Sequence, residues 1–502
     1  MTLIGPSRLP EKLYTAERVH RLDRCAIEQF GIPGLTLMQR AGATAFGYLQ
    51  KRWSEVQRLA VICGTGNNGG DGYVVARLAL EAGLSVQLLQ MGDGGRLSRD
   101  ALACAREFRQ SGGRVEPFQG VPEGCDLVVD AVLGTGLERE VTGAWGEMVR
   151  AVNRHPAPVL ALDMPSGLHS DSGCVMGCAV QADATVTFIG LKQGLFTGEG
   201  PDLCGEIMFD DLGVPAGLYD AVEATANRMT WTGCARKLQP RRRTAHKGNC
   251  GHLLVVGGDS GFSGALQMAG EAAARTGAGL VSLATRAAHA ALVSSRRPEL
   301  MSHGVESATE LAPLLVRADV VAIGPGLGQR SWGRAMLGRV LESGVPMVVD
   351  ADALNLLAQE PTCRDNWVLT PHPGEAARLL GCSVAEIQSD RFQAARSLQQ
   401  RYGGVVLLKG AGTLVVEAAD RLPGVCVEGN PGMASGGMGD LLTGIIGGLM
   451  AQGESPGAAA RMGVCLHGQA ADLAAREGER GMLATDLLPN LRRLLNPEGG
   501  PC

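Results

Sequence analysis

Short apolar runs alternate with amphipathic segments along the first part of the chain. The runs have the length of buried strands, and the segments between them carry apolar residues at helical spacing. The expected strands are 59–63, 85–90, 127–130 and 159–163, and the expected helices are 15–28 with Thr15 as N-cap, 72–82, 98–110 and 144–154. Because this alternation is typical of a parallel sheet, we expect a Rossmann-like α/β layer.

The pattern changes between residues 217 and 247, where a mixed polar stretch contains several arginines and lysines. A second and longer alternation follows, with expected strands at 252–256, 280–284, 320–323, 347–349, 367–370 and 405–409. No repeat of fixed short period relates the halves. The sequence therefore predicts two different α/β domains, residues 1–225 and 226–502.

Composition adds limits on location and partners. The apolar share of 45% and charged share of 19% are those of a globular protein. The net charge of −5 gives no general attraction to nucleic acid or membrane, and only 241–247 is locally basic. The apolar stretch 441–450 is about half a bilayer span, so we expect a buried helix. Fourteen cysteines without a CxxC pair, and an N-terminus without the apolar core of a signal peptide, predict a cytoplasmic protein with reduced thiols.

Glycine, with 72 residues, is about twice as frequent as in average proteins, and it gathers in loops that follow expected strands. The first such loop is Gly64-Thr65-Gly66-Asn67-Asn68-Gly69-Gly70-Asp71-Gly72. It precedes an expected helix, and in that position backbone N–H groups bind phosphate. An ordinary dinucleotide fingerprint has no acid where Asp71 stands. The alternative is a tight turn in which Asp71 only caps the helix.

Two further strand-end loops are expected beside it, 130–137 and 163–167. Since ligands of open α/β sheets bind at the carboxyl ends of strands, the three loops should meet in one crevice. Carboxylate, amide and hydroxyl oxygens there suit a monovalent or alkaline-earth cation rather than zinc. Asp130 alone would more often be a strand-end cap.

These loops resemble the NAD(P)H-hydrate (NAD(P)HX) epimerases over residues 13–212, through LMQRAG, GTGNNGGDG, DAVLGTGL, LDMPSGL and FIGLKQGL. The resemblance implies inversion at C6 of the hydrated nicotinamide, with Asp163 as the catalytic residue facing the ring. It implies a potassium ion held by Asn68, Asp130 and Ser166. Lys192 is either an electrostatic helper or a surface lysine. The implied substrate-binding residues are Asn67, Asn68, Gly69, Gly70, Asp71, Gly134, Thr135, Gly136, Leu137, Glu138, Arg139, Glu140 and Asp163.

The second half has no P-loop, and its distinctive string is Asn430-Pro431-Gly432-Met433-Ala434-Ser435-Gly436-Gly437-Met438-Gly439-Asp440. N–H groups at the start of the following helix suit a transferring phosphoryl group, and Asp440 could take a proton from a hydroxyl. The alternative is a simple helix cap. Other strand-end loops are 324–328, 370–375 with His372 between two prolines, and 409–413, where Lys409 could equally be solvated.

This half resembles the ADP-dependent NAD(P)H-hydrate dehydratases of the ribokinase-like superfamily over residues 246–495. The matching pieces are HKGNCGHLLVVGG, the Gly264-Ala265 turn, GPGLG, VVDADALN, LTPHPGE, LLKGAGT and NPGMASGGMGD. The resemblance implies that Asp440 is catalytic, that Mg²⁺ bridges the phosphates, and that ADP is the co-substrate. The implied substrate contacts are Ala265, Gly326, His372 and Asp440, and the implied ADP contacts are Lys409, Gly410, Ala411, Gly412, Thr413 and Gly439.

Together the two resemblances predict a bifunctional repair enzyme that acts on NADHX and NADPHX, and we expect a homo-oligomer. One rival is a ribokinase-like kinase that releases a stable phosphorylated product, because the same acidic loop serves both reactions. An attached epimerase argues against it. A catalytically silent dinucleotide-binding scaffold is the other rival, and the presence of both Asp163 and Asp440 argues against that.

Overall fold

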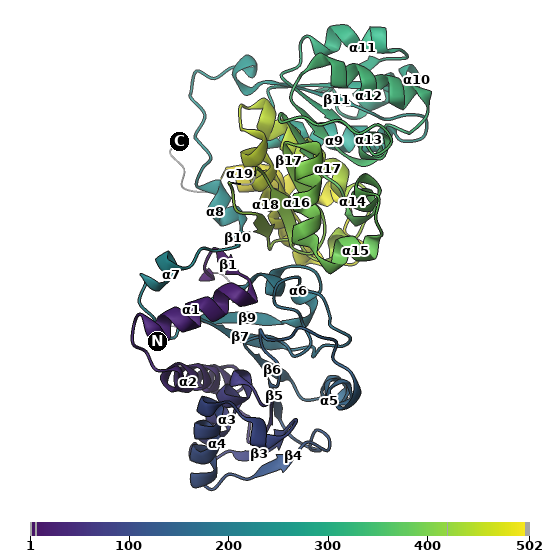
Figure 1. Ribbon diagram of the computed structural model, residues 1–502. Helices are drawn as coiled ribbons and strands as arrows, with labels where there is room; N and C mark the ends of the chain where they lie inside the picture. Colours follow the sequence, from purple (N-terminus) through teal and green to yellow (C-terminus); the bar gives the residue numbers. More distant parts are fainter. Residues whose placement is uncertain (1–2, 6–7, 419, 497–502) are drawn as a thin grey trace. The chain divides into compact units, whose positions relative to one another are not determined.

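The computed structural model describes residues 3–5, 8–418 and 420–496 (Figure 1). It divides into two compact units, residues 1–227 and 228–502, whereas the sequence suggested a boundary after residue 225. No helix in the described ranges is long and apolar enough to cross a membrane.

The first unit is built on a seven-stranded sheet in which all neighbouring strands are parallel. From edge to edge the strands are β4 (Val115–Pro117), β3 (Ser85–Gln90), β2 (Arg58–Cys63), β5 (Leu127–Ala131), β6 (Val159–Leu162), β7 (Ala184–Phe188) and β9 (Glu206–Asp210). From β2 the chain builds outward through β3 and β4, then returns to add β5 on the other side. This reversal of strand order opens a crevice at the carboxyl ends of β2 and β5.

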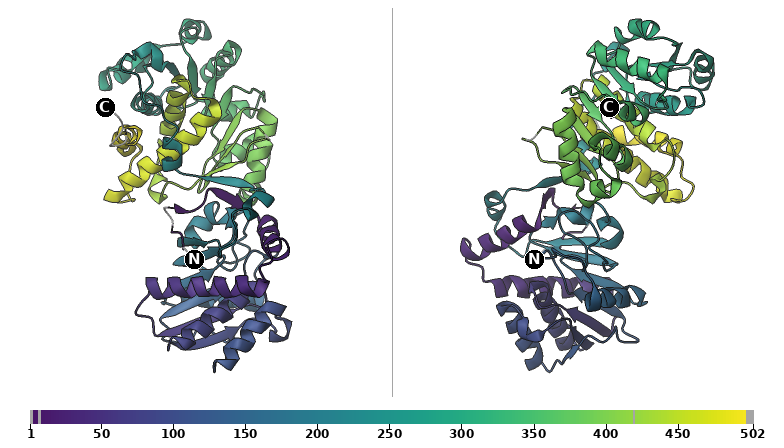
Figure 2. Two further views of the ribbon diagram at one scale, coloured as in Figure 1. Left: turned by 90° about the vertical axis from the view of Figure 1, so that its left-hand side faces the viewer. Right: turned by 45° about the vertical axis from the view of Figure 1, so that its right-hand side comes forward.

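Helices cover both faces of this sheet (Figures 1 and 2). Because side chains alternate along a strand, Leu59 and Val61 of β2 face one core while Ala60 and Ile62 face the other. The first core is closed by α1 (Ala16–Glu28), α2 (Gly34–Arg52), α3 (Asn67–Glu81) and α4 (Arg99–Gln110), and the second by α5 (Gly143–Arg154).

Short elements complete the unit. Strand β1 (Lys12–Tyr14) pairs in parallel with β8 (Leu191–Lys192) and antiparallel with β10 (Ala226–Met229). Two short helices are α6 (Gly200–Leu203) and α7 (Leu218–Ala221). The pairing of β1 with β8 fixes the backbone of Lys192 beside Tyr14.

The second unit has a sheet in which the first seven strands are parallel and the last two are antiparallel. In order they are β13 (Met301–Gly304), β12 (Leu280–Thr285), β11 (His252–Val256), β14 (Val320–Ile323), β15 (Met347–Val349), β16 (Trp367–Leu369), β17 (Val405–Leu408), β18 (Thr413–Val416) and β19 (Gly424–Cys426). The chain again reverses direction across the sheet, between β11 and β14. The loops after β14, β15, β16 and β17 therefore lie at neighbouring strand ends.

Four helices bury one core of this sheet: α9 (Ser263–Thr276), α17 (Met438–Ala451), α18 (Pro456–Ala474) and α19 (Leu488–Leu495). Helix α17 packs so closely on α9 that a Cβ on Gly444 would lie 2.0 Å from the carbonyl oxygen of Ala269. The other helices are α8 (Trp231–Ala235), α10 (Ala287–Arg296), α11 (Ala308–Leu315), α12 (Ser331–Ser343), α13 (Ala351–Leu357), α14 (Pro373–Leu380), α15 (Val384–Ser389) and α16 (Arg391–Tyr402).

The expected α/β class with parallel sheets is confirmed in both units. Every expected strand is present within one or two residues of its predicted ends, and the apolar stretch 441–450 is the buried helix α17. One interpretation was wrong: Asp71 does not lie in a loop. Helix α3 begins at Asn67, so Asp71 lies inside the helix and is not its N-cap.

Candidate active sites

A cavity of about 440 Å³ lies at the carboxyl ends of the strands of the first unit. Among its lining residues are the predicted Asn67, Asn68, Asp71, Gly134, Thr135, Gly136, Leu137 and Asp163. Five other predicted substrate contacts do not line it. Glu138, Arg139 and Glu140 are exposed beyond the loop, and Gly69 and Gly70 are buried behind the first turn of α3.

Those two glycines serve close packing of α3. A Cβ on Gly69 would lie 2.0 Å from the carbonyl oxygen of Gly64, and one on Gly70 would lie 2.3 Å from the sulfur of Met38. The loop Gly64–Gly66 can therefore turn directly into the helix. The first turn of α3 presents Asn67 and Asn68 to the cavity, with its N–H groups in the orientation that favours anions.

Asp130 and Ser166 form a buried pair behind this cavity. The Ser166 hydroxyl donates to Oδ1 of Asp130 at 2.6 Å, and the Ser166 N–H donates to Oδ2 at 2.7 Å. The Leu133 N–H in turn donates to the Ser166 hydroxyl at 2.8 Å. Burial raises the pKa of Asp130 to about 6, although the hydrogen bonds from Ser166 oppose this shift.

Asn68, the third predicted potassium ligand, is 8% exposed, and neither its amide oxygen nor its amide nitrogen has a hydrogen-bond partner among the described residues. A Cβ on Gly134 would lie 3.5 Å from Cβ of Asn68, so this amide lies against the loop that follows β5. A buried amide oxygen without a partner is costly unless a ligand satisfies it. The donor set of amide, carboxylate and hydroxyl oxygens fits a hard cation.

Asp163 lies at the end of β6 in a left-handed backbone conformation, with φ at 66°. Such a conformation is uncommon for a residue other than glycine and is typical of functional sites. Its Oδ1 accepts a hydrogen bond from the ammonium of Lys192. That ammonium also donates to the Thr187 hydroxyl at 3.0 Å and to the Phe188 carbonyl at 2.9 Å. Because Lys192 is 1% exposed, the surface-lysine interpretation is wrong.

Two more carboxyls face the same cavity. Burial raises the pKa of Asp71 well above its usual range, and the negative charges of Asp163 and Asp23 add to the effect. Burial likewise raises the pKa of Asp23, on α1, to about 6. The cavity thus combines an ion-paired carboxylate with carboxyls that hold protons more tightly than usual, which suits acid–base chemistry.

The second site is centred on an ion pair between two strand ends. Nζ of Lys409, after β17, lies 2.8 Å from Oδ1 of Asp350, after β15, and 3.8 Å from Oε2 of Glu375. Lys409 is therefore paired and mostly buried, so a solvated role is wrong. The carboxyls of Asp350 and Glu375 raise the pKa of Lys409 despite its burial, which keeps the ammonium charged.

Asp440 lies in the first turn of α17, beside this pair. The helix starts after Gly437, whose φ of 93° suits glycine. A Cβ on Gly439 would lie 3.3 Å from Nζ of Lys409 and 3.5 Å from Oδ2 of Asp350. Burial raises the pKa of Asp440 to about 7, with Asp350 and Asp352 adding to the shift and Lys409 opposing it.

His372 is the N-cap of α14, with its ring about half exposed. Its Nδ1 accepts a hydrogen bond from the Gly374 N–H at 2.9 Å, while the backbone N–H of His372 donates to Oε2 of Glu375 at 2.8 Å. Burial and the nearby Lys409 lower the pKa of His372, and its Nε2 is turned toward Oε1 of Glu375 at 3.4 Å. Since Glu375 contacts both His372 and Lys409, His372 lies at the second site.

The other predicted contacts lie on neighbouring loops. A Cβ on Gly326, with φ at 59°, would lie 3.4 Å from Cβ of Ala265, so these two residues adjoin. The same loop is linked to Asp352 by a hydrogen bond of 2.9 Å from the Gly328 N–H. The predicted ADP-binding segment from Lys409 to Thr413 forms a tight turn, in which the Thr413 hydroxyl donates to the Gly410 carbonyl at 2.8 Å.

Comparisons with known proteins show which families the two halves match. Residues 253–493 match the model of the NAD(P)H-hydrate dehydratase family, and residues 34–194 match that of the YjeF-related protein N-terminus. The bifunctional NAD(P)H-hydrate repair enzyme Nnr of Coxiella burnetii is 51% identical, covering 97% of this chain and 99% of the relative. The Escherichia coli enzyme of the same name is 48% identical, with 98% and 96% covered. This chain belongs to the bifunctional NAD(P)H-hydrate repair enzymes.

A solved structure of a hypothetical protein from Streptococcus mutans has 28% identity and a TM-score of 0.50, and it covers 53% of this chain and 98% of that one. The family recognised from the motifs is thus confirmed in both halves. Membership agrees with a Rossmann-like first domain and a ribokinase-like second domain.

Several residues of these repair-enzyme sites were not selected from the sequence. Asp350 stands in VVDADALN and Glu375 in LTPHPGE, so both lay inside recognised strings at strand ends and could have been found by the same strand-end rule. Asp23 had no such signal, because it is one polar residue of an amphipathic helix. Only the packing of α1 brings it to the cavity.

Proposed function

We propose that the first domain interconverts the R and S forms of NADHX and NADPHX, and that the second dehydrates the S form with ADP, giving NAD(P)H, AMP and phosphate. The observation that carries this proposal is the position of Asp440. It lies in the first turn of α17, with a pKa raised to about 7, beside the charged ammonium of Lys409. A carboxyl of this kind can accept a proton near neutral pH while the adjacent ammonium stabilises phosphate charge.

In the first domain, inversion at C6 needs an acid when the hydroxyl leaves and a base when water returns. Asp163 carries out this proton transfer, and Lys192 holds its carboxylate in place and stabilises its charge. Asn67, Asn68, Asp71 and Gly134–Leu137 bind the substrate within the cavity. Glu138, Arg139 and Glu140 contact only a substrate that extends beyond it.

A potassium ion bound by Asn68, Asp130 and Ser166 would supply positive charge for the substrate's phosphates. The unpartnered amide oxygen of Asn68 supports this assignment. Asp130, whose pKa is raised to about 6, would be ionised in the presence of the cation, because positive charge favours the carboxylate form.

In the second domain, Asp440 removes the proton from the C6 hydroxyl, whose oxygen attacks the terminal phosphorus of ADP. AMP leaves and a phosphate ester forms at C6. The lone pair of the ring nitrogen then expels phosphate, which regenerates the dihydronicotinamide. Ala265, Gly326 and His372 contact the hydrated nucleotide, while residues 409–413 and Gly439 bind ADP. Mg²⁺, held mainly by the phosphates and water, would neutralise their charge.

A kinase that releases a stable phosphate ester is the rival function, and one assay separates the two. Mixed R and S hydrates are incubated with ADP and Mg²⁺, and AMP, free phosphate and the absorbance of reduced nicotinamide are followed. Repair predicts full return of absorbance with one AMP and one phosphate for each nicotinamide. A phosphorylated product without that absorbance would contradict the proposal. A homo-oligomer and a cytoplasmic location stay predictions, and light scattering of the purified chain tests the first.

A further inference from the structure

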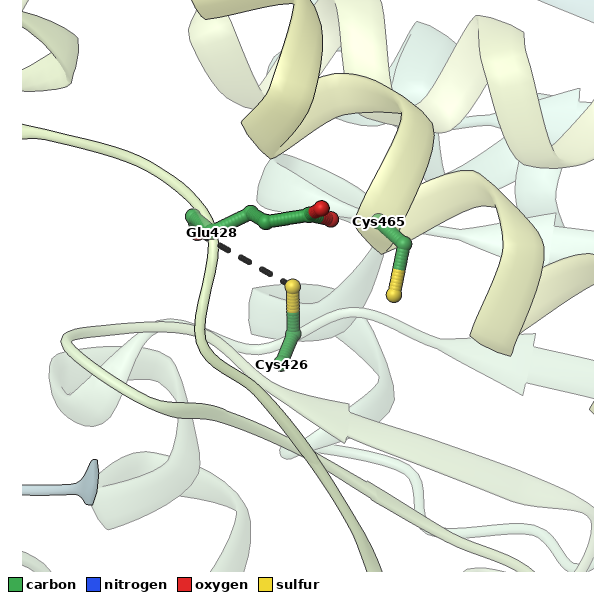
Figure 3. Close-up of side chains that lie close together, drawn as sticks. All are labelled: Cys426, Glu428 and Cys465. Carbon is green, nitrogen blue, oxygen red and sulfur yellow. Dashed lines mark hydrogen bonds between the residues drawn. The ribbon is translucent and has the colours of Figure 1, made fainter. Parts of the chain in front are cut away.

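Two thiols and a carboxylate converge away from both active sites, where the end of β19 approaches helix α18 (Figure 3). Cys426 is the last residue of β19, Glu428 follows two residues later, and Cys465 lies on α18. The two sulfurs and a carboxylate oxygen of Glu428 all lie within 4.8 Å of one another. Cys426 is 2% exposed and Cys465 is fully buried.

A third thiol lies beside this group, on helix α8. Hydrogen bonding to the thiols of Cys234 and Cys426, together with burial, raises the pKa of Cys465 well above its usual range. Cys234 also lies near enough to add to the raised pKa of Glu428, which burial brings to about 8. Cys234 therefore lies beside Cys465 but outside the group of three whose ligand atoms are within 4.8 Å of one another, and its thiol donates a hydrogen bond of 3.8 Å to the Arg461 carbonyl.

The composition of this cluster points to one kind of ligand. Thiolate sulfur and carboxylate oxygen are ligands of Zn²⁺, which prefers four of them in a tetrahedron. With zinc–sulfur bonds of about 2.3 Å, the sulfurs of such a tetrahedron lie about 3.8 Å apart, which the spacing of Cys426, Cys465 and Glu428 accommodates after small side-chain movements. Mg²⁺ and Ca²⁺ are disfavoured because they prefer all-oxygen sites.

We propose that Cys426, Cys465 and Glu428, whose ligand atoms lie within 4.8 Å of one another, bind one zinc ion in a structural site of the second domain, and that the side chain of Cys234 turns to supply the fourth ligand. Binding displaces the thiol and carboxyl protons to solvent, and no oxidation or reduction takes place. The four side chains supply a closed set of ligands, so the site is suited to stability rather than to catalysis.

The position of the cluster indicates what the ion would do. Both oxygens of Glu428 already accept hydrogen bonds from the Trp231 N–H, at 2.8 and 2.7 Å, which ties the loop after β19 to the start of α8. This loop continues to Asn430 and ends at Gly437, where α17 begins. Zinc would fix the first residues of the segment that carries Gly439 and Asp440.

The test uses the full chain, treated with a chelator under reducing conditions and then titrated with Zn²⁺ or Co²⁺. We expect one equivalent to bind, Co²⁺ to show an intense sulfur-to-metal charge-transfer band, and Zn²⁺ to raise the melting temperature. Cys465→Ser and Cys426→Ser should each lower the affinity by more than about 100-fold, since losing even an outer-shell partner often weakens metal binding 10- to 100-fold. Cys382→Ser, at a half-buried thiol outside the cluster, is the matched control.

Glu428→Gln provides a variant of nearly the same shape, and it should bind Co²⁺ with the charge-transfer band retained but with weaker affinity. If a serine variant does not fold, the band of the unaltered chain and the Glu428→Gln titration still decide the matter. Absence of a sulfur-to-cobalt band would overturn the proposal. Unchanged affinity in a folded Cys465→Ser variant would also overturn it. So would a disulfide between Cys426 and Cys465 in protein that was purified under reducing conditions.

Discussion

The ammonium of Lys409 lies 2.8 Å from Oδ1 of Asp350, a contact that joins the ends of two strands in the second domain. Hydroxyls of Thr370 and Thr443 donate to the same carboxylate at 2.8 and 3.0 Å. Burial opposes ionisation of Asp350, but the attraction of Lys409 and these hydrogen bonds keep its pKa below the usual value. Both partners are therefore charged, and the charge of each favours ionisation of the other.

Replacing Asp350 by Asn should strongly destabilise the second domain. The variant leaves the mostly buried Lys409 with Glu375, at 3.8 Å, as its remaining ion-pair partner among the described residues, and with the more distant charge of Asp440. Removing one member of a buried ion pair typically costs about 3 kcal/mol or more. Chemical denaturation with a probe of the second domain measures this loss. Glu342→Gln breaks an exposed pair with Arg339 and should change stability by less than about 0.5 kcal/mol. Equal stability of the two variants would contradict the prediction.

Dehydration should depend on the ionisation of Asp440. Since the base must be a carboxylate, kcat/KM should rise about tenfold per pH unit below pH 7 and level off above it, following the pKa of about 7. Asp440→Asn should lower the rate by a factor of about 10² to 10⁴.

Asp352→Asn removes a negative charge that raises the pKa of Asp440, so the pH profile of this variant should shift to lower pH. Asp365→Asn, at an exposed position, should leave the profile where it was. A profile that is flat from pH 5 to 8 would count against Asp440 as the base.

Epimerisation should fail selectively when Lys192 is replaced by Met. The variant removes the partner of Asp163 but keeps an apolar chain of similar length in the buried space. We expect a loss of about 100-fold or more in R-to-S conversion, the scale of general acid–base catalysis. With mixed hydrates, ADP and Mg²⁺, the reaction should stop near the S fraction apart from spontaneous epimerisation. Lys51→Met, at an exposed lysine of α2, is the control, and full conversion by both variants would exclude the role of Lys192.

The difference between what the sequence predicted and what it missed lies in long-range contacts. The strand-end rule drew attention to Asp163, and the glycine-rich string before an apolar helix drew attention to Asp440, while the family resemblance supplied their roles. Neither pattern could pair Lys192 with Asp163, 29 residues away, or Lys409 with Asp350, 59 residues away, since those contacts depend on how strands assemble. Hydrophobic periodicity did not identify helix α2 either, because its three glycines and two threonines weaken the amphipathic pattern that marked α1.

Asp23 should lower the stability of the first domain at neutral pH. Burial raises its pKa from 3.8 to about 6, so between these values the unfolded chain is ionised while the folded chain still holds the proton. Stability is therefore lost as the pH rises from about 4 to 6, and the loss then stays constant, at no more than about 3 kcal/mol. Asp23→Asn keeps the shape without the charge, so its melting temperature should exceed that of the unaltered chain at pH 7 and match it near pH 4. The control is Asp100→Asn. Asp100 lies in the first turn of α4 and is another carboxyl that lines the same cavity, so its replacement should not reproduce this pH-dependent difference. If Asp23→Asn melted below the unaltered chain at pH 7, the carboxylate would have to be stabilising the fold rather than opposing it.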